Sequence, residues 1–185
     1  MLNLNDFILF DPLVNHKSNL PKKKGNYIVT IRDIRALPTQ GCKIVTSLLQ
    51  GREVIYTGIT SNSKGLYYRI GNQHLGDNAG RSTLRLSLGC LLGYTLIPRD
   101  KSKPDNGMVR FNVNDELALL KWMNENLLFY FLPNESPKKL EAKLIEELNP
   151  PLNLQENYNP VNQEFRTAIK SLRRQRPWRQ QTPLI

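Results

Sequence analysis

The chain has 185 residues, of which 26 are Lys or Arg and 16 are Asp or Glu, so its formal net charge is +10. This length suits one ordinary domain with extensions and excludes a large multidomain machine. The positive excess points to a polyanionic partner, and a hydrophobic fraction of 39% argues against global disorder and for a packed core.

Three further classes of protein are disfavoured by the sequence. Its most apolar window, 88–97, is about half as long as a membrane-spanning helix requires. The first ten residues lack the basic segment and cleavage site of a secretion signal, so a cytoplasmic location is expected. Cys42 and Cys90 show no metal-type spacing, which argues against structural zinc and against a disulfide framework.

The first third of the chain predicts an arm and two strands. Residues 1–24 mix apolar and polar residues and end on a basic run, as expected for an N-terminal arm packed on the domain. Alternating β-branched and aromatic residues over 26–33 and 52–60 predict strands. The segment 34–51 between them is too long for a tight turn, so we interpret it as an insertion.

Two helices follow. One begins near Gly65, although Gly71 and Gly76 weaken its periodicity and mark two candidate ends. Ser82 is a good N-cap for the next, because leucines recur on one face after it at positions 84, 88, 91 and 92.

The remaining elements alternate strands and helices. A short strand is predicted around 109–113, a helix opens at Asp115, and the apolar run 128–132 predicts another strand. Ser136 followed by Pro137 marks the start of a helix with a leucine stripe, which prolines 150 and 151 terminate. The segment 158–185 is a basic extension that contains a short amphipathic helix.

Residue types suited to phosphodiester cleavage fall on these elements. Tyr27 and Tyr56 lie on the two predicted strands, Arg69 and His74 on the first helix, and Glu141 on the last helix before the prolines. A guanidinium and a bound cation lower the barrier to cleavage because they neutralise charge that develops on the phosphate. A single carboxylate suits magnesium, which keeps several waters when bound.

The ordered set resembles the GIY-YIG nuclease superfamily, in particular its free-standing bacterial members, over about 25–157. Gly25-Asn26-Tyr27 stands in the place of the first motif and Tyr56-Thr57-Gly58 in the place of the second. The segments GLYYRIGNQHL, AGRSTLRLSLGCLL and LEAKLIEELNPPLN are similar to the family's arginine helix, serine-threonine-leucine-arginine block and glutamate helix. Asn26 and Thr57 depart from the pattern, because they replace the isoleucines of the family name.

The resemblance implies an α/β fold with a small, mainly antiparallel central sheet flanked by helices. It further implies that Tyr27 positions or deprotonates the attacking water with support from Tyr56, that Arg69 grips the scissile phosphate, and that Asn153 completes the site. Glu141 would hold one divalent cation, Mg²⁺ or Mn²⁺.

His74 is a special case, because it follows Arg69 by five residues where the family commonly shows four. On a regular helix a residue at i+5 lies about 140° around the axis. His74 therefore joins the site only if the helix bulges or ends at Gly71.

Basic residues outside the site are candidate phosphate contacts, because cations that neutralise a nucleic-acid backbone release its counterions. They are Lys22, Lys23, Lys24, Arg81, Arg85, Arg166, Lys170, Arg173 and Arg174.

The sequence therefore predicts a divalent-metal-dependent DNA endonuclease, restriction-like or from a defence or mobile-element system, with a dimer as one way to cut both strands. Two alternatives stay open, namely a nucleic-acid-binding module that does not cleave and a nuclease that acts on RNA or single-stranded DNA. The intact set of candidate catalytic residues argues against the first alternative.

Overall fold

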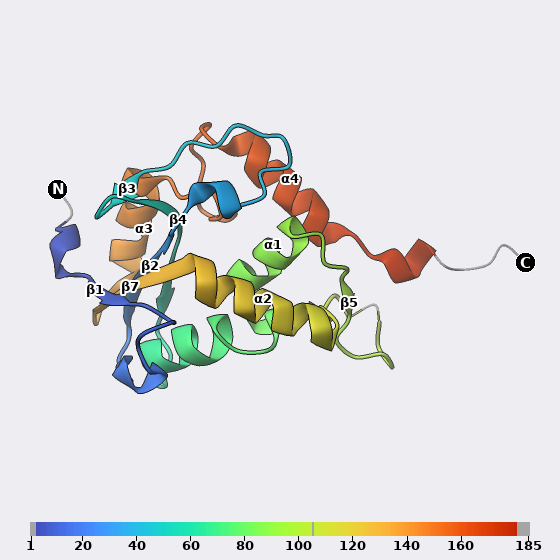
Figure 1. Cartoon of the computed structure of the whole chain (residues 1–185), viewed down its shortest axis with the longest axis horizontal. Helices are drawn as coiled ribbons and strands as arrows, with labels where there is room; N and C mark the ends of the chain where they lie inside the picture. The colour runs from blue at the N-terminus through green and yellow to red at the C-terminus, as the bar shows by residue number, and fades with distance from the viewer. Residues whose placement is uncertain (1–2, 105, 181–185) are drawn as a thin grey trace, which may run out of the picture.

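A computed structural model describes residues 3–104 and 106–180, and its main sheet has five strands, which lie on the left-hand side in Figure 1. The strands lie in the order β1-β7-β2-β4-β3, and each neighbouring pair is antiparallel. This arrangement confirms the predicted α/β fold with an antiparallel sheet. The strands are β1 (Ile8–Phe10), β2 (Gly25–Ile31), β3 (Leu48–Leu49), β4 (Arg52–Thr60) and β7 (Leu127–Pro133).

The central strands β2, β4 and β7 agree with the three predicted apolar runs, and β4 has the predicted bounds. The strand predicted at 109–113 is shorter and lies elsewhere. Its residues Val109–Arg110 form β6, which pairs with β5 (Ile97–Pro98) in a separate two-stranded sheet. A pair of two-residue strands gives no alternating pattern long enough to be recognised from the sequence.

Helices cover both faces of the central sheet. α3 (Pro137–Leu148) packs on one face, where Ile28 and Leu144 belong to the same buried cluster. The other face carries the larger core, to which β2 contributes the alternate residues Tyr27, Val29 and Ile31. The helical elements that include buried members of this larger core are η4 (Tyr67–His74), η5 (Ala79–Arg81), α1 (Thr83–Leu91), α2 (Val113–Asn126) and α4 (Gln163–Arg174).

The helix starts follow from local capping. Ser82 caps α1 as predicted, because its Oγ accepts a hydrogen bond from the Arg85 backbone N–H at 3.1 Å. α2 begins earlier than predicted, because Asn112 is its cap and accepts from the Asp115 backbone N–H at 2.9 Å. α3 starts at Pro137 as predicted, although its N-cap Ser136 makes no side-chain cap bond, and it ends at Leu148, before the C-cap Asn149, whose φ of 41° is left-handed.

The segments on either side of the central elements are packed into the same core. Phe10 and Leu20 of the N-terminal arm and Phe165 and Ile169 of α4 are buried members of the larger cluster. The insertion 34–51 is fastened to the start of α4, because the Asn162 side chain accepts from the Val45 N–H at 2.8 Å and donates to its carbonyl at 2.7 Å. In Figure 1 this connection runs across the top of the molecule toward α4.

Within the described residues, the helices are too short or too polar to cross a bilayer.

Candidate active site

The site is built against the edge of β4, which β3 covers only at Arg52 and Glu53. Beyond that point the segment after α3 takes the place of a neighbouring strand. The Asn153 side chain accepts from the Thr57 N–H at 2.9 Å and donates to the Thr57 carbonyl at 3.0 Å. Asn153 therefore satisfies backbone groups that the sheet leaves unpaired. These bonds fix the backbone of β4 at Thr57, next to Tyr56.

Tyr27 is the centre of a bonded group of side chains. Its ring is fully buried, and its hydroxyl accepts from Arg69 Nε at 3.1 Å and lies 2.7 Å from His74 Nε2. Burial, with a smaller contribution from Tyr56, raises the pKa of Tyr27 well above its ordinary value. Tyr27 is therefore a neutral phenol in the folded protein.

The helix that carries Arg69 explains how His74 reaches the same hydroxyl. η4 is a π-helix, in which the backbone bonds run from i to i+5, and the Leu75 N–H continues this pattern to the Ile70 carbonyl at 2.9 Å. Residues five apart then share one side of the helix. From the sequence, His74 could join the site only if the helix bulged or ended at Gly71. The helix bulges, since η4 continues through Gly71 as a π-helix.

The second ring nitrogen of His74 is also bonded, because Nδ1 lies 2.7 Å from Ser82 Oγ. Burial, with the positive charges of Arg69 and Arg85 adding to it, lowers the pKa of His74 well below its ordinary value. His74 is thus a neutral imidazole held at both nitrogens. Sequence reasoning identified Ser82 only as a helix cap, and nothing in the pattern signalled this second role.

Two of the predicted phosphate contacts are wrong. Arg85 has no exposed surface, because its guanidinium donates to Glu116 Oε2 at 2.6 Å and to the His74 carbonyl at 3.2 Å. Arg166 is also buried, and it donates to the backbone carbonyls of Asn159 and Val161. Both arginines lie on the core-facing sides of their helices, where protein acceptors satisfy them.

Glu116 is the acidic residue that the sequence analysis did not single out. It is buried, and its second oxygen, Oε1, accepts from the Ala79 N–H at 2.8 Å and from the Phe111 N–H at 3.2 Å. The ion pair with Arg85 therefore joins α1, α2 and the loop before α1 directly behind His74. An acidic residue in the first turn of a helix is usually an exposed dipole partner, so its position gave no signal of burial.

Glu141 lies on the open side of the site. It lines a cavity of about 200 Å³ together with Tyr56, Thr83, Asn153 and Arg173. The carboxylate is half-buried and makes no hydrogen bond or ion pair with any residue in the described part of the chain. Burial, reinforced by the negative charge of Glu156, raises its pKa, although Arg69 opposes the shift.

The two tyrosines differ in their relation to this cavity. Tyr56 lines it, and the Tyr56 hydroxyl lies 3.1 Å from Thr83 Oγ1. Tyr27 lies behind it, with its ring centroid 6.3 Å from that of Tyr56. The structure thus brings the predicted residues together in two layers, with the Tyr27 group inside and Tyr56 and Glu141 outside.

The two departures from the family pattern have structural roles. Asn26 is buried, and its Nδ2 donates at 2.8 Å to the carbonyl of Pro137, which is the first residue of α3 and lies one turn before Glu141. Thr57 receives the Asn153 side chain described above. Both polar residues therefore fix the elements that present the open side of the site.

Gly58 allows the close approach of Tyr27 to β4. A Cβ at this position would lie 2.3 Å from the Tyr27 hydroxyl oxygen, which is shorter than any contact that carbon and oxygen atoms can make without a shift. The second motif therefore ends in glycine because the buried tyrosine occupies the space of a side chain.

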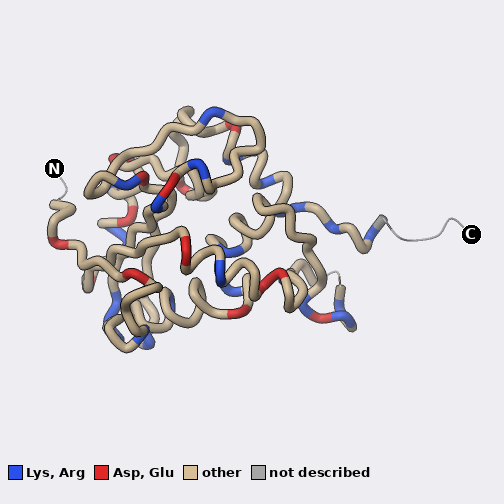
Figure 2. Tube along the Cα trace, viewed as in Figure 1, with Lys and Arg blue, Asp and Glu red and all other residues tan. Residues whose placement is uncertain are grey.

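The remaining predicted phosphate contacts lie at or near the surface, and Figure 2 shows basic residues recurring along α4 and beyond it. Lys22, Lys23, Lys24, Arg81, Lys170 and Arg174 are exposed. Arg173 is half-buried and lines both the Glu141 cavity and a neighbouring cavity of about 380 Å³, which Lys170, Arg174 and Arg176 also line. A positive surface therefore leads directly from α4 into the site.

The residues described by the structure include no cluster of three or more His, Cys, Asp or Glu side chains that would form a metal site by themselves. Any cation held here would depend on Glu141, on Glu156, which lines the same cavity, and on water ligands.

Comparison with known proteins agrees with this geometry. A family model described as the GIY-YIG catalytic domain matches residues 25–175, a range that begins at the first motif and includes α4. Searches of curated proteins and of solved structures return no match. The family match covers most of the chain and contains the Tyr27 group and Glu141 in their expected order. The chain therefore belongs to the GIY-YIG nuclease superfamily.

Proposed function

We propose that this nuclease is a divalent-metal-dependent endonuclease that hydrolyses phosphodiester bonds in DNA. The observation that carries the proposal is the unpartnered carboxylate of Glu141 in a cavity that it shares with Tyr56, close enough to Arg69 for their charges to interact. A half-buried carboxylate without a protein partner is costly unless a cation compensates it.

The residues present fit Mg²⁺ or Mn²⁺. Magnesium is commonly bound by one or two carboxylates and keeps several waters, which suits Glu141 in a cavity of about 200 Å³. When bound there, the cation would lower the pKa of a water molecule and neutralise charge on the phosphate.

Arg69 is prepared to hold the scissile phosphate. Its Nη1 donates to Gln73 Oε1 at 2.9 Å and to the Arg81 carbonyl at 3.3 Å, while Nε donates to Tyr27. Burial by itself lowers the pKa of Arg69. The interactions of the guanidinium with the oxygens of Tyr27 and Tyr56 outweigh this effect of burial, so the pKa of Arg69 is raised. An arginine has five N–H groups, so donors remain for phosphate oxygens.

The layering of the site divides the tyrosines by role. Tyr56 lines the cavity, so we assign to its hydroxyl the contact with the attacking water. Tyr27 has no exposed surface and instead holds Arg69 and His74 in position. This division differs from the one that the resemblance implied, in which Tyr27 met the water.

Duplex DNA is the proposed substrate because the positive surface of α4 continues into the cavity at Arg173. RNA and single-stranded DNA present the same scissile group, so the substrate has to be tested directly.

The test is incubation of the purified protein with supercoiled plasmid, single-stranded DNA or RNA, each with Mg²⁺, Mn²⁺ or a chelator. We expect the plasmid to be nicked or linearised with either metal and to stay intact with the chelator. Cleavage that persists in chelator would overturn the metal dependence, and cleavage of RNA alone would overturn the DNA assignment. Absence of cleavage under every condition would leave the non-cleaving binding module as the function.

A further inference from the structure

A second surface with the chemistry of nucleic-acid recognition lies at the start of η4, outside the Glu141 cavity. Tyr67 and Tyr68 line a cavity of about 380 Å³ with Lys22, Lys64, Ser63 and Asn72, and none of the described acidic residues lines it. We call these six residues the tyrosine platform. Its walls are mainly apolar, and both tyrosines are half-buried, which fixes the rings while leaving part of each accessible.

Lysine side chains lie over both rings. The ammonium groups of Lys17 and Lys22 lie 5.9 and 5.7 Å from the Tyr67 ring centroid, and that of Lys64 lies 4.9 Å from the Tyr68 centroid. These are cation–π contacts, which are weak at exposed sites. Because Lys22 and Lys64 are exposed, a flat ligand can displace them from the rings while their charges remain nearby.

The platform is directly connected to the proposed phosphate-binding residue. Tyr68 immediately precedes Arg69 in the chain. Arg81 also connects the two residues, because it forms hydrogen bonds with both. Arg81 Nη1 donates to the Tyr68 hydroxyl at 3.4 Å, and the Arg81 carbonyl accepts from Arg69 Nη1 at 3.3 Å. A nucleotide next to the one at Arg69 is therefore within reach of the platform.

We propose that the tyrosine platform binds an unpaired nucleobase of the substrate, stacked on Tyr68 or Tyr67, while Lys22 and Lys64 neutralise the flanking phosphates. This inference rests on the proposed nuclease function. A base inside a duplex has both faces covered by its neighbours, whereas an unpaired base can stack on an aromatic ring. The nuclease would then prefer duplexes that carry a single-stranded segment beside the scissile phosphate.

The test measures binding rather than cleavage, with the full-length protein in chelator. The probes are a blunt DNA duplex and the same duplex extended by an unpaired strand, in which each unpaired position in turn is replaced by the fluorescent base 2-aminopurine. We expect the extended duplex to bind about ten-fold more tightly, since one stacked base contributes about 1–3 kcal/mol. We also expect the fluorescence of one or two positions to be quenched on binding.

Variants assign the effect to the rings. Tyr68→Ala combined with Tyr67→Ala is expected to abolish the preference for the extended duplex and the quenching, whereas Tyr68→Phe should retain both because the ring remains. Lys64→Ala should keep the quenching and lower the dependence of log affinity on log salt by about one unit.

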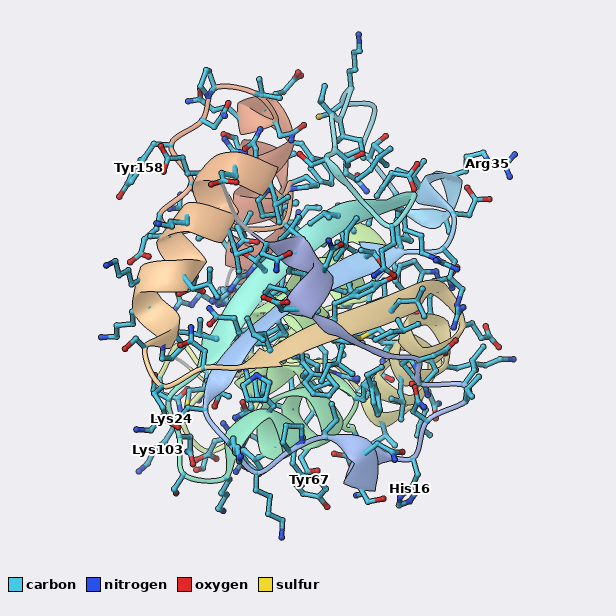
Figure 3. All side chains as sticks on the ribbon, turned by 90° about the vertical axis from the view of Figure 1, so that its left-hand side faces the viewer. His16, Lys24, Arg35, Tyr67, Lys103 and Tyr158 are labelled. Atoms are coloured by element: carbon cyan, nitrogen blue, oxygen red, sulfur yellow. The ribbon has the colours of Figure 1, made fainter. Side chains whose placement is uncertain are left out.

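Tyr158→Ala is the matched control. Tyr158 is 90% exposed, and in Figure 3 it lies at the opposite end of the molecule from Tyr67, so the variant should behave as the wild-type protein. An equal loss of affinity for both duplexes in the double alanine variant would assign the surface to general backbone binding and overturn the inference. Unchanged affinity and quenching would also overturn it. Because binding is scored in chelator, neither result depends on whether the protein cleaves DNA.

Discussion

The two sides of the active site differ in how completely their polar groups are satisfied. On the inner side, the Tyr27 hydroxyl, both nitrogens of His74 and the Arg69 guanidinium all have partners within the chain. On the outer side, the Glu141 carboxylate faces a cavity with no bonded partner in the described residues. The inner side is held in place by its own bonds before substrate arrives, with N–H groups of Arg69 still free for a phosphate, whereas the carboxylate on the outer side gains a partner only when a ligand binds.

This difference predicts how each side responds to mutation. The inner side is part of the hydrophobic core and is supported from behind by the buried ion pair of Arg85 and Glu116. Changes there should alter stability and activity together. Changes at Glu141 on the outer side should alter activity alone, because its carboxylate makes no hydrogen bond or ion pair within the described residues.

The largest effect is expected for Glu141→Gln. The amide keeps the shape but removes the charge that holds the cation, so the single-turnover cleavage rate should fall by about a thousand-fold or more, equivalent to about 4 kcal/mol of transition-state stabilisation. Thermal stability should be unchanged or slightly higher, since burial already opposes the charge on Glu141. Plasmid cleavage and thermal melting measure the two quantities.

Glu147→Gln is the control, because Glu147 is exposed on the same helix and should affect neither quantity. If Glu141→Gln destabilised the protein by several kilocalories per mole, Glu141 would belong to the inner, structural side and the comparison would fail.

A smaller effect on activity, accompanied by lost stability, is expected for Tyr27→Phe. The substitution leaves Arg69 Nε and His74 Nε2 without their shared partner. Each buried unsatisfied group costs about 1–3 kcal/mol, so the free energy of unfolding should fall by about 2 kcal/mol or more. The cleavage rate should fall by about ten- to a hundred-fold because Arg69 is no longer fixed.

Tyr130→Phe separates these effects from the loss of a buried hydroxyl in general. Tyr130 is also fully buried on the central sheet, but within the described residues its hydroxyl has no hydrogen-bond partner. The variant should be neutral or more stable, with normal cleavage. Equal destabilisation of the two variants would mean that the bonds of Tyr27 contribute nothing specific.

The sequence predicted the central strands and most helix starts because these elements are long and carry strong local signals. β4 has its predicted bounds, Ser82 caps α1 by a hydrogen bond, and Pro137 suits the first helical position of α3 because its φ is fixed. The candidate catalytic residues were identifiable through the order of the family motifs, which local periodicity by itself does not provide.

What the sequence did not predict depends on contacts between distant segments. The burial of Arg85 depends on Glu116, 31 residues further along the chain, and the role of Asn153 depends on the open edge of β4. The platform at Tyr67 and Tyr68 needs Lys22, which approaches from the N-terminal arm. No helical or strand pattern encodes such pairings, since they arise only when the elements pack.

The smallest expected effect concerns the pH dependence of stability and tests whether the inner side stays closed in solution. In the unfolded chain His74 takes up a proton near pH 6.5, whereas in the folded protein its pKa lies well below that value because of burial. Between the two pKa values the unfolded state binds more protons than the folded state. The contribution of neutral His74 to the free energy of unfolding is therefore fully present above about pH 7.5 and is lost as the pH falls. The slope is at most about 1.4 kcal/mol per pH unit.

His74→Gln removes the titrating ring and keeps hydrogen-bonding groups. Denaturant unfolding of the wild-type protein and the variant from pH 7.5 to pH 5 should show the stability difference shifting in favour of the variant by about 1–2 kcal/mol as the pH falls. His16→Gln, at the exposed histidine labelled in Figure 3, should retain the wild-type pH dependence because His74 is intact. A stability difference between the wild-type protein and His74→Gln that stays constant with pH would mean that water reaches His74, and the inner side would then be as open as the side that carries Glu141.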